Sequence, residues 1–329
     1  MPGPRPRDEI PLRYVRTGSR LPAPVELVLN AVLSRGAGYE PVPAGSAWDD
    51  SSVRGYYIDY SAKTGSPAFR DPARLNAVDL IQLGLAWHER ELAGDASARD
   101  RFIGVCKLVE DRAEPAGDEL RWWIRYPVPK YRVPPPWCSA LSQGQAASLF
   151  VRAHLATGDD RYAELAIRAA APLLSEHGSD LVTHTGAGPV LQEYPSDPPS
   201  HVLNGWISAL WGLWDVRLGL TDARADAATT ATLACLVANL DAYDTGWWTR
   251  YSLYPFALQD LAKPIYQTFH VAQLRVLHGL TGDDRIRTVA ERWAGYDRPA
   301  PRLAALGQKA LFAAADFPRR RRWSPDAPA

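Results

Sequence analysis

Polar side chains recur where four apolar helices are expected to begin. Amides, phenols and basic groups gather at those points, and the tyrosine- and tryptophan-rich loop YDTGWWTRYSLYPF adds more of them. The set includes Gln143, Glu193, Tyr194, Asn204, Arg250, Tyr251, Lys263, Tyr266 and His270. Aromatic faces stack on sugar rings, amides pair with sugar hydroxyls, and basic groups near helix N-termini attract an anion. If these residues share one cleft, its best-matched ligand is a saccharide that carries a carboxylate.

Four turns indicate which elements position these residues. The turns lie around Gly94, Gly158, Thr221 and Gly282, and two of them share the sequence TGDDR. Glycine ends one helix and aspartate begins the next, as expected of a helical hairpin. The helix before each turn is apolar on most faces, whereas the helix after it is amphipathic. The pattern predicts a mainly α fold, an (α/α) toroid or barrel whose inner helices all open on one face.

The rest of the chain is expected to surround this barrel. Residues 1–70 are rich in Pro, Gly and Ser and predict an irregular N-terminal arm, followed by the barrel over residues 71–317. The stretch DELRWWIRYPVPKY, residues 118–131, alternates aromatic and charged side chains, which predicts a small β-hairpin insertion. Residues 318–329 carry a basic run and then prolines, and we expect a disordered tail.

Charge and cysteine content argue against several classes of function. The chain of 329 residues has 37 basic and 37 acidic side chains, so no overall field favours nucleic acid. Its three cysteines, Cys106, Cys138 and Cys235, lack the spacing of a zinc site or a disulfide framework. No segment is typical of a signal peptide or a membrane span. We therefore expect a cytoplasmic protein with no nucleic-acid partner, no metal and no cofactor.

Four stretches of the sequence resemble the C-terminal domain of the D-glucuronyl C5-epimerases, which act on heparan-type polysaccharides. They are WCSALSQGQAASLFVRAHLATGD, EYPSDPPSHVLNGWISALWGLWD, YDTGWWTRYSLY and YQTFHVAQL, and they occur in the family's order. The resemblance extends from about Tyr57 to Trp293. It implies an α/α-barrel, a uronate-containing poly- or oligosaccharide as substrate, and a homodimer.

The resemblance also implies a reaction. In that family C5 of a glucuronate inside the polymer is inverted to give iduronate. Loss of the C5 proton builds an enolate-like dianion, and inversion needs a proton from the opposite face, so two acid/base groups must flank the ring. The catalytic residues of the family correspond to Glu193, Tyr194, Tyr251 and Tyr266. We place Glu193 and Tyr194 on one face, Tyr266 on the other, and Tyr251 against the substrate carboxylate.

Further residues are assigned to substrate binding. Gln143 and Asn204 are expected to bind sugar hydroxyls, and Trp247 to stack on a ring. A free phenol titrates near pH ~10, so a tyrosine base needs a cation beside it. His270, one helical turn after Tyr266, is the expected cation, and Arg250 is a second basic residue for the site.

Two positions depart from the family pattern, and two other functions stay open. Gln192 stands where relatives have an acid, and Tyr254 where they have an arginine. A uronate polysaccharide lyase starts with the same proton abstraction but expels the C4 oxygen. A non-catalytic relative would bind acidic glycans in the same cleft without turnover.

Overall fold

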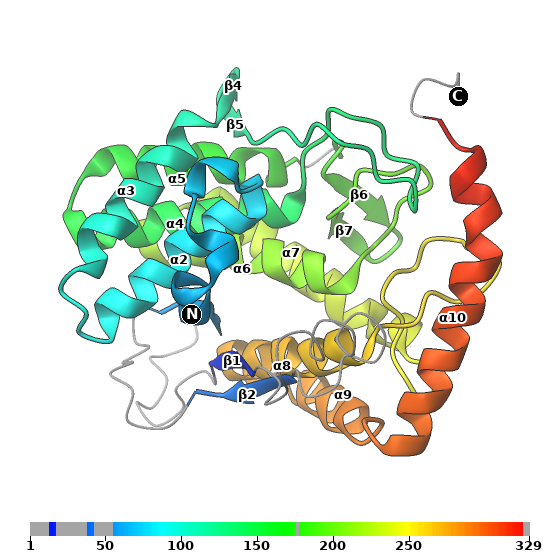
Figure 1. Cartoon of the computed structure of the whole chain (residues 1–329). Coiled ribbons are helices and arrows are strands. Elements are labelled where there is room, and N and C mark those ends of the chain that lie inside the picture. The colour runs from blue at the N-terminus through cyan, green and yellow to red at the C-terminus, as the bar shows by residue number, and fades with distance from the viewer. Residues whose placement is uncertain (1–12, 18–37, 43–54, 176–177, 325–329) are drawn as a thin grey trace.

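The computed structural model describes residues 13–17, 38–42, 55–175 and 178–324, and these fold mainly into helices (Figure 1). The α-helices are α2 (Ala77–Leu92), α3 (Ala98–Asp111), α4 (Ala140–Thr157), α5 (Asp160–Ala170), α6 (Leu203–Leu220), α7 (Ala223–Asn239), α8 (Pro264–Thr281), α9 (Asp284–Ala294) and α10 (Pro299–Arg322). Short 3-10 helices are η1 (Ser61–Gly65), η2 (Pro67–Phe69), η3 (Pro72–Arg74), η4 (Ala171–Leu173) and η5 (Leu240–Tyr243). The expected mainly α class is confirmed.

The α-helices from α2 to α9 form successive pairs joined by turns at the expected positions. The residue that ends α4, α6 or α8 adopts a left-handed conformation, with φ of 71° at Gly158, 55° at Thr221 and 68° at Gly282. In each case the following aspartate accepts a hydrogen bond from the backbone at the start of the next helix. These turn residues reverse the chain because they end one helix and cap the next.

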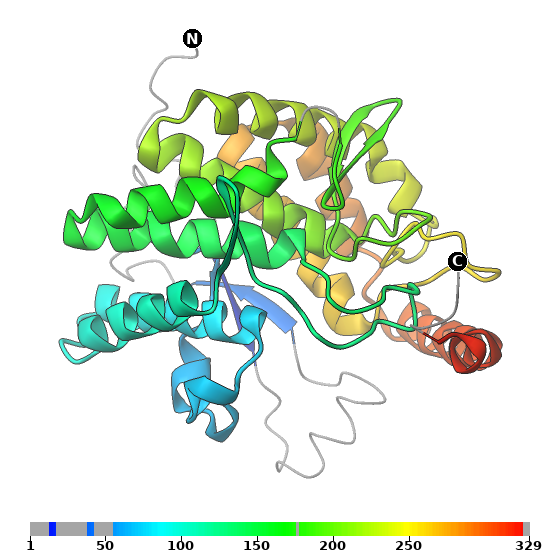
Figure 2. The same ribbon diagram turned by 90° about the horizontal axis from the view of Figure 1, so that it is seen from above.

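The first helix of each pair packs against the first helix of its neighbours. Contacts run in the order α2, α4, α6 and α8, and Figure 2 shows the green α4 pair between the cyan α2 pair and the yellow-green α6 pair. Helices α4 and α6 approach most closely, since a Cβ atom on Gly144 would lie 2.6 Å from the Cα atom of Ala209. A Cβ atom on Gly212 would lie 2.3 Å from the Cα atom of Gly144. Backbone therefore packs on backbone here, and only glycine fits.

Three small sheets accompany the helices. Strands β1 (Tyr14–Thr17), β2 (Gly38–Pro41) and β3 (Ile58–Asp59) form one sheet in the order β2-β1-β3, antiparallel and then parallel. Strands β4 (Glu114–Ala116) and β5 (Glu119–Arg121) form a hairpin, as do β6 (Val182–Thr185) and β7 (Gly188–Leu191).

These strands correct two sequence expectations. The described parts of the arm, residues 1–70, are not all irregular, because they contain β1, β2 and β3. The insertion expected at 118–131 begins earlier, at β4, and residues 122–137 are a loop with isolated bridges. Its prolines remove backbone donors, so the loop does not extend the ladder. The β6-β7 hairpin was not expected, since its short strands lack clear alternation.

A tight ion pair holds residues 55–57 to the helical core. The Arg152 guanidinium on α4 lies 2.6 Å from the Asp215 carboxylate on α6, and both side chains are buried. Arg152 also donates to the carbonyl oxygen of Gly55, and the Tyr57 hydroxyl donates to Asp215 at 2.8 Å. Because both charges have partners, their burial is tolerated.

Helix α10 replaces the expected disordered tail over residues 318–322. Its buried side chains are Ala305, Phe312 and Asp316, and its last turn carries four arginines, two of which pair with Asp316. The boundary expected after residue 317 therefore falls inside a helix, because the basic run has an acid within one helical turn. Residues 325–329 of the expected tail lie outside the described part of the chain.

We expect Gly144→Ala to lower the free energy of unfolding by at least about 1–3 kcal/mol, because the added methyl group would push α4 away from α6. Urea denaturation measures the change. Gly104→Ala is the matched control, since Gly104 lies within α3 and a Cβ atom there has nothing within 4 Å. The free energy of unfolding of that control should rise by about 0.5–1 kcal/mol, because helices favour alanine over glycine by this amount. Equal effects in both variants would contradict the tight α4-α6 contact.

Candidate active site

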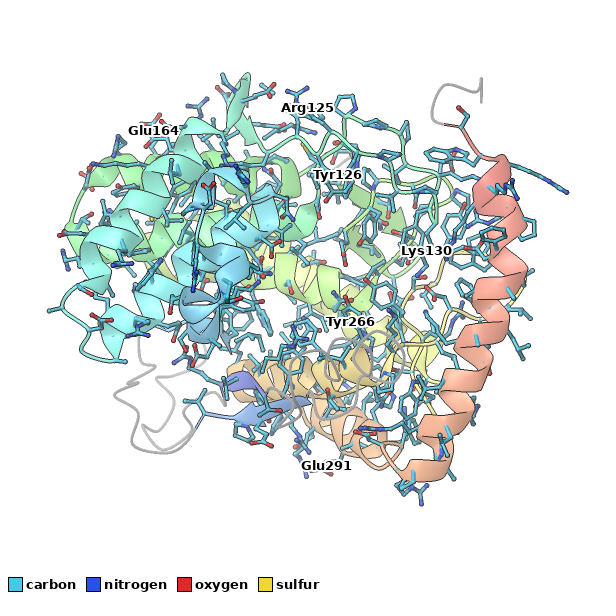
Figure 3. All side chains as sticks on the ribbon, in the orientation of Figure 1. Arg125, Tyr126, Lys130, Glu164, Tyr266 and Glu291 are labelled. Atoms are coloured by element: carbon cyan, nitrogen blue, oxygen red, sulfur yellow. The ribbon has the colours of Figure 1, made fainter. Side chains whose placement is uncertain are left out.

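One cavity of about 1210 Å³ is lined by four of the polar residues that the sequence singled out, Glu193, Tyr194, Asn204 and Tyr266. It is bordered by the N-terminal sheet and η1, by α2, by the loop after β5, by the β7-α6 connection, and by α8 and α10. Figure 3 shows Tyr126 and Lys130 on the loop after β5, with Lys130 near α10, and Tyr266 on α8. Its ionisable lining residues are Arg16, Tyr39, Asp59, Tyr60, Lys63, Asp79, Tyr126, Lys130, Glu193, Tyr194, Tyr266, Arg320 and Arg321.

Glu193 is fixed at this cavity by the chain before and after it. It follows β7 and precedes α6, where the backbone N–H of Leu203 donates to the carbonyl oxygen of Tyr251. Its carboxyl group lies over Gly205, since a Cβ atom there would be 2.2 Å from Glu193 Oε2. The Asn204 amide is 3.5 Å from the same oxygen. The VLNG sequence thus supplies both the space and one polar neighbour for Glu193.

Burial makes Glu193 a proton-exchanging group near neutral pH. Only 8% of the residue is exposed, and loss of hydration raises the pKa of its carboxyl to about 7. A hydrogen bond with the Tyr194 phenol and the charge of Lys130 act in the opposite direction and lower this pKa. A carboxyl group with this balance can both accept and release a proton at neutral pH.

Three phenols adjoin Glu193, and none is set up as a resting phenolate. Burial raises the pKa of Tyr194 and Tyr251 well above 10.0, and that of Tyr266 is also raised. Tyr194 lies beside Glu193, and Tyr251 lies beside both other phenols, close enough for each to shift the pKa of its neighbour. The phenols are therefore neutral donors in the resting protein.

Tyr251 lies behind the cavity wall rather than on it. Its ring centre is 4.8 Å from that of Tyr266 and 4.6 Å from the Lys130 ammonium. It does not line the cavity, whereas Glu193, Tyr194, Asn204 and Tyr266 do. The expectation that Tyr251 touches the substrate carboxylate is therefore not supported by its position.

Lys130 is the basic residue that sequence reasoning missed. Its ammonium lies 2.6 Å from Asp260, which also pairs with Lys309 of α10. Burial lowers the pKa of Lys130 to about 8, while the charge of Asp260 opposes that shift. No periodic pattern marks this lysine in the sequence, because it lies in an irregular loop. Its place on the cavity wall follows only from the fold.

His270 is not the expected cation. It is fully buried, its Nδ1 atom is 3.1 Å from the Thr249 hydroxyl, and burial lowers its pKa to about 3. The imidazole is therefore neutral at pH 7. Helical spacing indicates that His270 lies on the same side of α8 as Tyr266, but it does not indicate whether the ring is hydrated. The prediction was wrong because the ring is buried away from water.

Three further predicted binding residues do not line the cavity. Gln143 is fully buried and its amide donates to the carbonyl oxygens of Leu120 and Ala169. Trp247 packs near Trp248 in a separate apolar cluster. Arg250 forms a backbone bridge with Leu261. The structure brings none of these three to Glu193.

The two departures from the family pattern have structural partners. Gln192 is buried, and its amide donates to Thr183 while its carbonyl oxygen accepts from the backbone of His201. Gln192 thereby holds the loop that carries Glu193. Tyr254 packs beneath Arg319 of α10, with the guanidinium 5.5 Å from the ring centre.

Two negative observations apply to the described residues. Among them, no group of three or more His, Cys, Asp or Glu side chains is arranged to hold a metal ion. None of their helices combines the length and apolar character needed to cross a membrane.

Comparison of the sequence with known proteins shows the family of this chain. Residues 117–295 match the model of the D-glucuronyl C5-epimerase C-terminus, which is more than half of the chain. The chain belongs to this family. The matched stretch contains Lys130, Glu193, Tyr194 and Tyr266 and ends before α10.

Two relatives illustrate the extent of the similarity. The D-glucuronyl C5-epimerase of Caenorhabditis elegans is 31% identical over 183 residues, which cover 51% of this chain and 30% of the relative. An uncharacterized protein of Methanocaldococcus jannaschii is 30% identical over 179 residues, covering 52% and 56% of the two chains. The matches span less than two thirds of either relative.

The unusual pKa of Glu193 predicts a pH-dependent stability. Folding raises this pKa from 4.5 to about 7, so the folded state holds the proton more tightly and the free energy of unfolding falls as pH rises between these values. Glu193→Gln removes this ionisation. From about pH 5 to about pH 8, we expect the free energy of unfolding of the variant to rise by about 2–3 kcal/mol relative to that of the parent. Urea denaturation at both pH values measures it, and a pH-independent difference would contradict the buried ionisable carboxyl.

Proposed function

We propose that this protein is a uronate C5-epimerase that converts D-glucuronate units of a glycan to L-iduronate. The observation that carries the proposal is the cavity in which Glu193, with a pKa of about 7, adjoins neutral phenols and the Lys130 ammonium. Membership of the D-glucuronyl C5-epimerase family supports the same reaction. We also propose that the helical pairs form the (α/α) toroid expected from the sequence.

The first step of the proposed reaction is proton removal. The ionised Glu193 carboxylate takes the proton from C5, and the electron pair of the C–H bond moves into the adjacent carboxylate, which becomes an enolate-like dianion. We propose that Lys130, and not His270, is the cation that stabilises this charge. A preorganised cation in a buried site stabilises developing charge more strongly than water does.

The second step returns a proton from the opposite face. The Tyr266 phenol donates it to C5, which inverts the centre and leaves a phenolate. The proton on Glu193 then passes through Tyr194 and Tyr251 to Tyr266, which adjoin one another in that order. Each group regains its starting state, as a catalytic cycle requires. Asn204 holds the Glu193 carboxyl and binds a sugar hydroxyl.

Incubation of an alternating glucuronate–N-acetylglucosamine polymer in heavy water tests the reaction. We expect deuterium at C5 and iduronate in the product, read by NMR and disaccharide composition. Because each variant removes one acid/base group, Glu193→Gln and Tyr266→Phe should each lower turnover by about 10²–10⁴-fold. Tyr296→Phe is the control, since its hydroxyl binds Asp244 outside the cavity. Unsaturated chain ends would indicate a lyase, and binding without exchange would indicate a glycan-binding relative.

Replacement of Lys130 tests the proposed cation. Lys130→Gln should lower turnover by about 10²–10³-fold, because one preorganised charge is lost from the developing dianion. Substrate affinity should change less than turnover, since the dianion exists only during the reaction. Lys107→Gln, an exposed change on α3, is the matched control. Unchanged turnover in the Lys130 variant would remove this residue from the mechanism.

A further inference from the structure

The last turn of α10 forms a basic and aromatic wall of the cavity. Phe317, Arg320 and Arg321 line the same space as Glu193 and Lys130. Arg321 is exposed and forms no ion pair with any residue that the structure describes, while Arg320 pairs with Asp316. This wall lies outside residues 117–295, so the family match does not account for it.

The position of α10 is fixed by contacts of several kinds. Phe312 is buried and packs edge-on against Phe256, with ring centres 4.9 Å apart. Lys309 pairs with Asp260 and donates to the carbonyl oxygen of Leu261. Closer to the end of the helix, Arg319 donates to the carbonyl oxygen of Lys130. The last turn is thus held beside the loop that carries Lys130.

Two exposed aromatic side chains occur on this part of the cavity. Tyr126 is 53% exposed and Phe317 is 60% exposed, and both line the cavity. Exposed aromatic faces bordering a cavity are suited to stack on sugar rings. Arginine presents a planar fork that binds a carboxylate through two parallel hydrogen bonds. Together these groups are suited to bind a sugar that carries a carboxylate, and not a neutral sugar.

The size and charge of the cavity fit more than one sugar. Its volume of about 1210 Å³ exceeds the ~300–1,000 Å³ typical of pockets for single small ligands. The acids that line the cavity are Glu193, at the proposed reaction site, Asp59 of β3 and Asp79 of α2. Asp79 is paired with Lys63. None of these acids belongs to α10 or to the loop after β5, so that part of the wall is basic.

We propose that the C-terminal turn of α10 is a second carboxylate-binding subsite, in which Arg320 and Arg321 hold a neighbouring uronate of the glycan whose reacting uronate lies at Glu193. Phe317 and Tyr126 stack on the sugars of that part of the chain. This proposal rests on the proposed function, because it takes the same glycan as ligand. It makes the enzyme select substrates with at least two uronates.

Calorimetric titration with two oligosaccharides tests the subsite. The probes are a disaccharide and a hexasaccharide of alternating glucuronate and N-acetylglucosamine. We expect Arg321→Gln and Arg320→Gln each to weaken hexasaccharide binding by about tenfold, the loss of one charge-assisted hydrogen bond, and to leave disaccharide binding unchanged. Arg322→Gln is the matched control, because it makes the same change on the same helix at a residue that does not line this cavity. Circular dichroism confirms that each variant is folded.

The outcomes separate the subsite from the reaction. Equal hexasaccharide affinity in Arg321→Gln, Arg322→Gln and the parent overturns the subsite, and deuterium at C5 in the parent would still support the epimerase. Equal weakening of both probes by Arg321→Gln also overturns it, because a second subsite affects only the longer ligand. A parent protein that binds neither probe and exchanges no C5 hydrogen overturns the proposed function and the subsite together.

Discussion

The contact between α4 and α6 is the constraint on which the site depends. At Gly144 and Gly212 the two helix backbones meet with no room for a side chain. This contact fixes the start of α6, where Gly205 leaves space for the Glu193 carboxyl. Since a folded core is densely packed, a shift of either helix would be transmitted to that carboxyl. Gly144 and Gly212 therefore permit the helical packing, and Gly205 leaves the room in which the Glu193 carboxyl is buried.

Burial then sets the chemistry of Glu193, of the phenols beside it and of Lys130. Loss of hydration raises the pKa of Glu193 and of the phenols, and lowers the pKa of Lys130. These opposite shifts follow from one rule, that a dry environment disfavours the charged form. The carboxyl and the ammonium both move toward neutrality, with pKa values of about 7 for Glu193 and about 8 for Lys130. Glu193 can thus take up and release a proton near neutral pH, while the phenols stay protonated until the reaction demands their proton.

The sequence predicted those parts whose signals are local. Gly158 followed by Asp159 specifies a helical turn through backbone conformation and capping, and all four hairpins appeared where such turns occur. Asn204 and Tyr266 lie in the first turns of α6 and α8, and Glu193 and Tyr194 lie on the segment that leads into α6, so their convergence could be predicted from the topology. Lys130 and α10 could not, because their roles depend on distant partners such as Asp260. His270 failed for a related reason: helical spacing gives a direction, but hydration depends on everything packed around the ring.

In the proposed mechanism, Glu193 and Tyr266 lie on opposite faces of the reacting sugar, and the C-terminal end of α10 holds the next uronate. A crystal structure of the Glu193→Gln protein with a bound glucuronate hexasaccharide tests this arrangement most directly. We predict that C5 of one glucuronate lies within about 3–3.5 Å of both the residue 193 side chain and the Tyr266 hydroxyl, on opposite faces of the ring. A sugar that has both groups on the same face, or that binds away from them, would contradict the proposed mechanism.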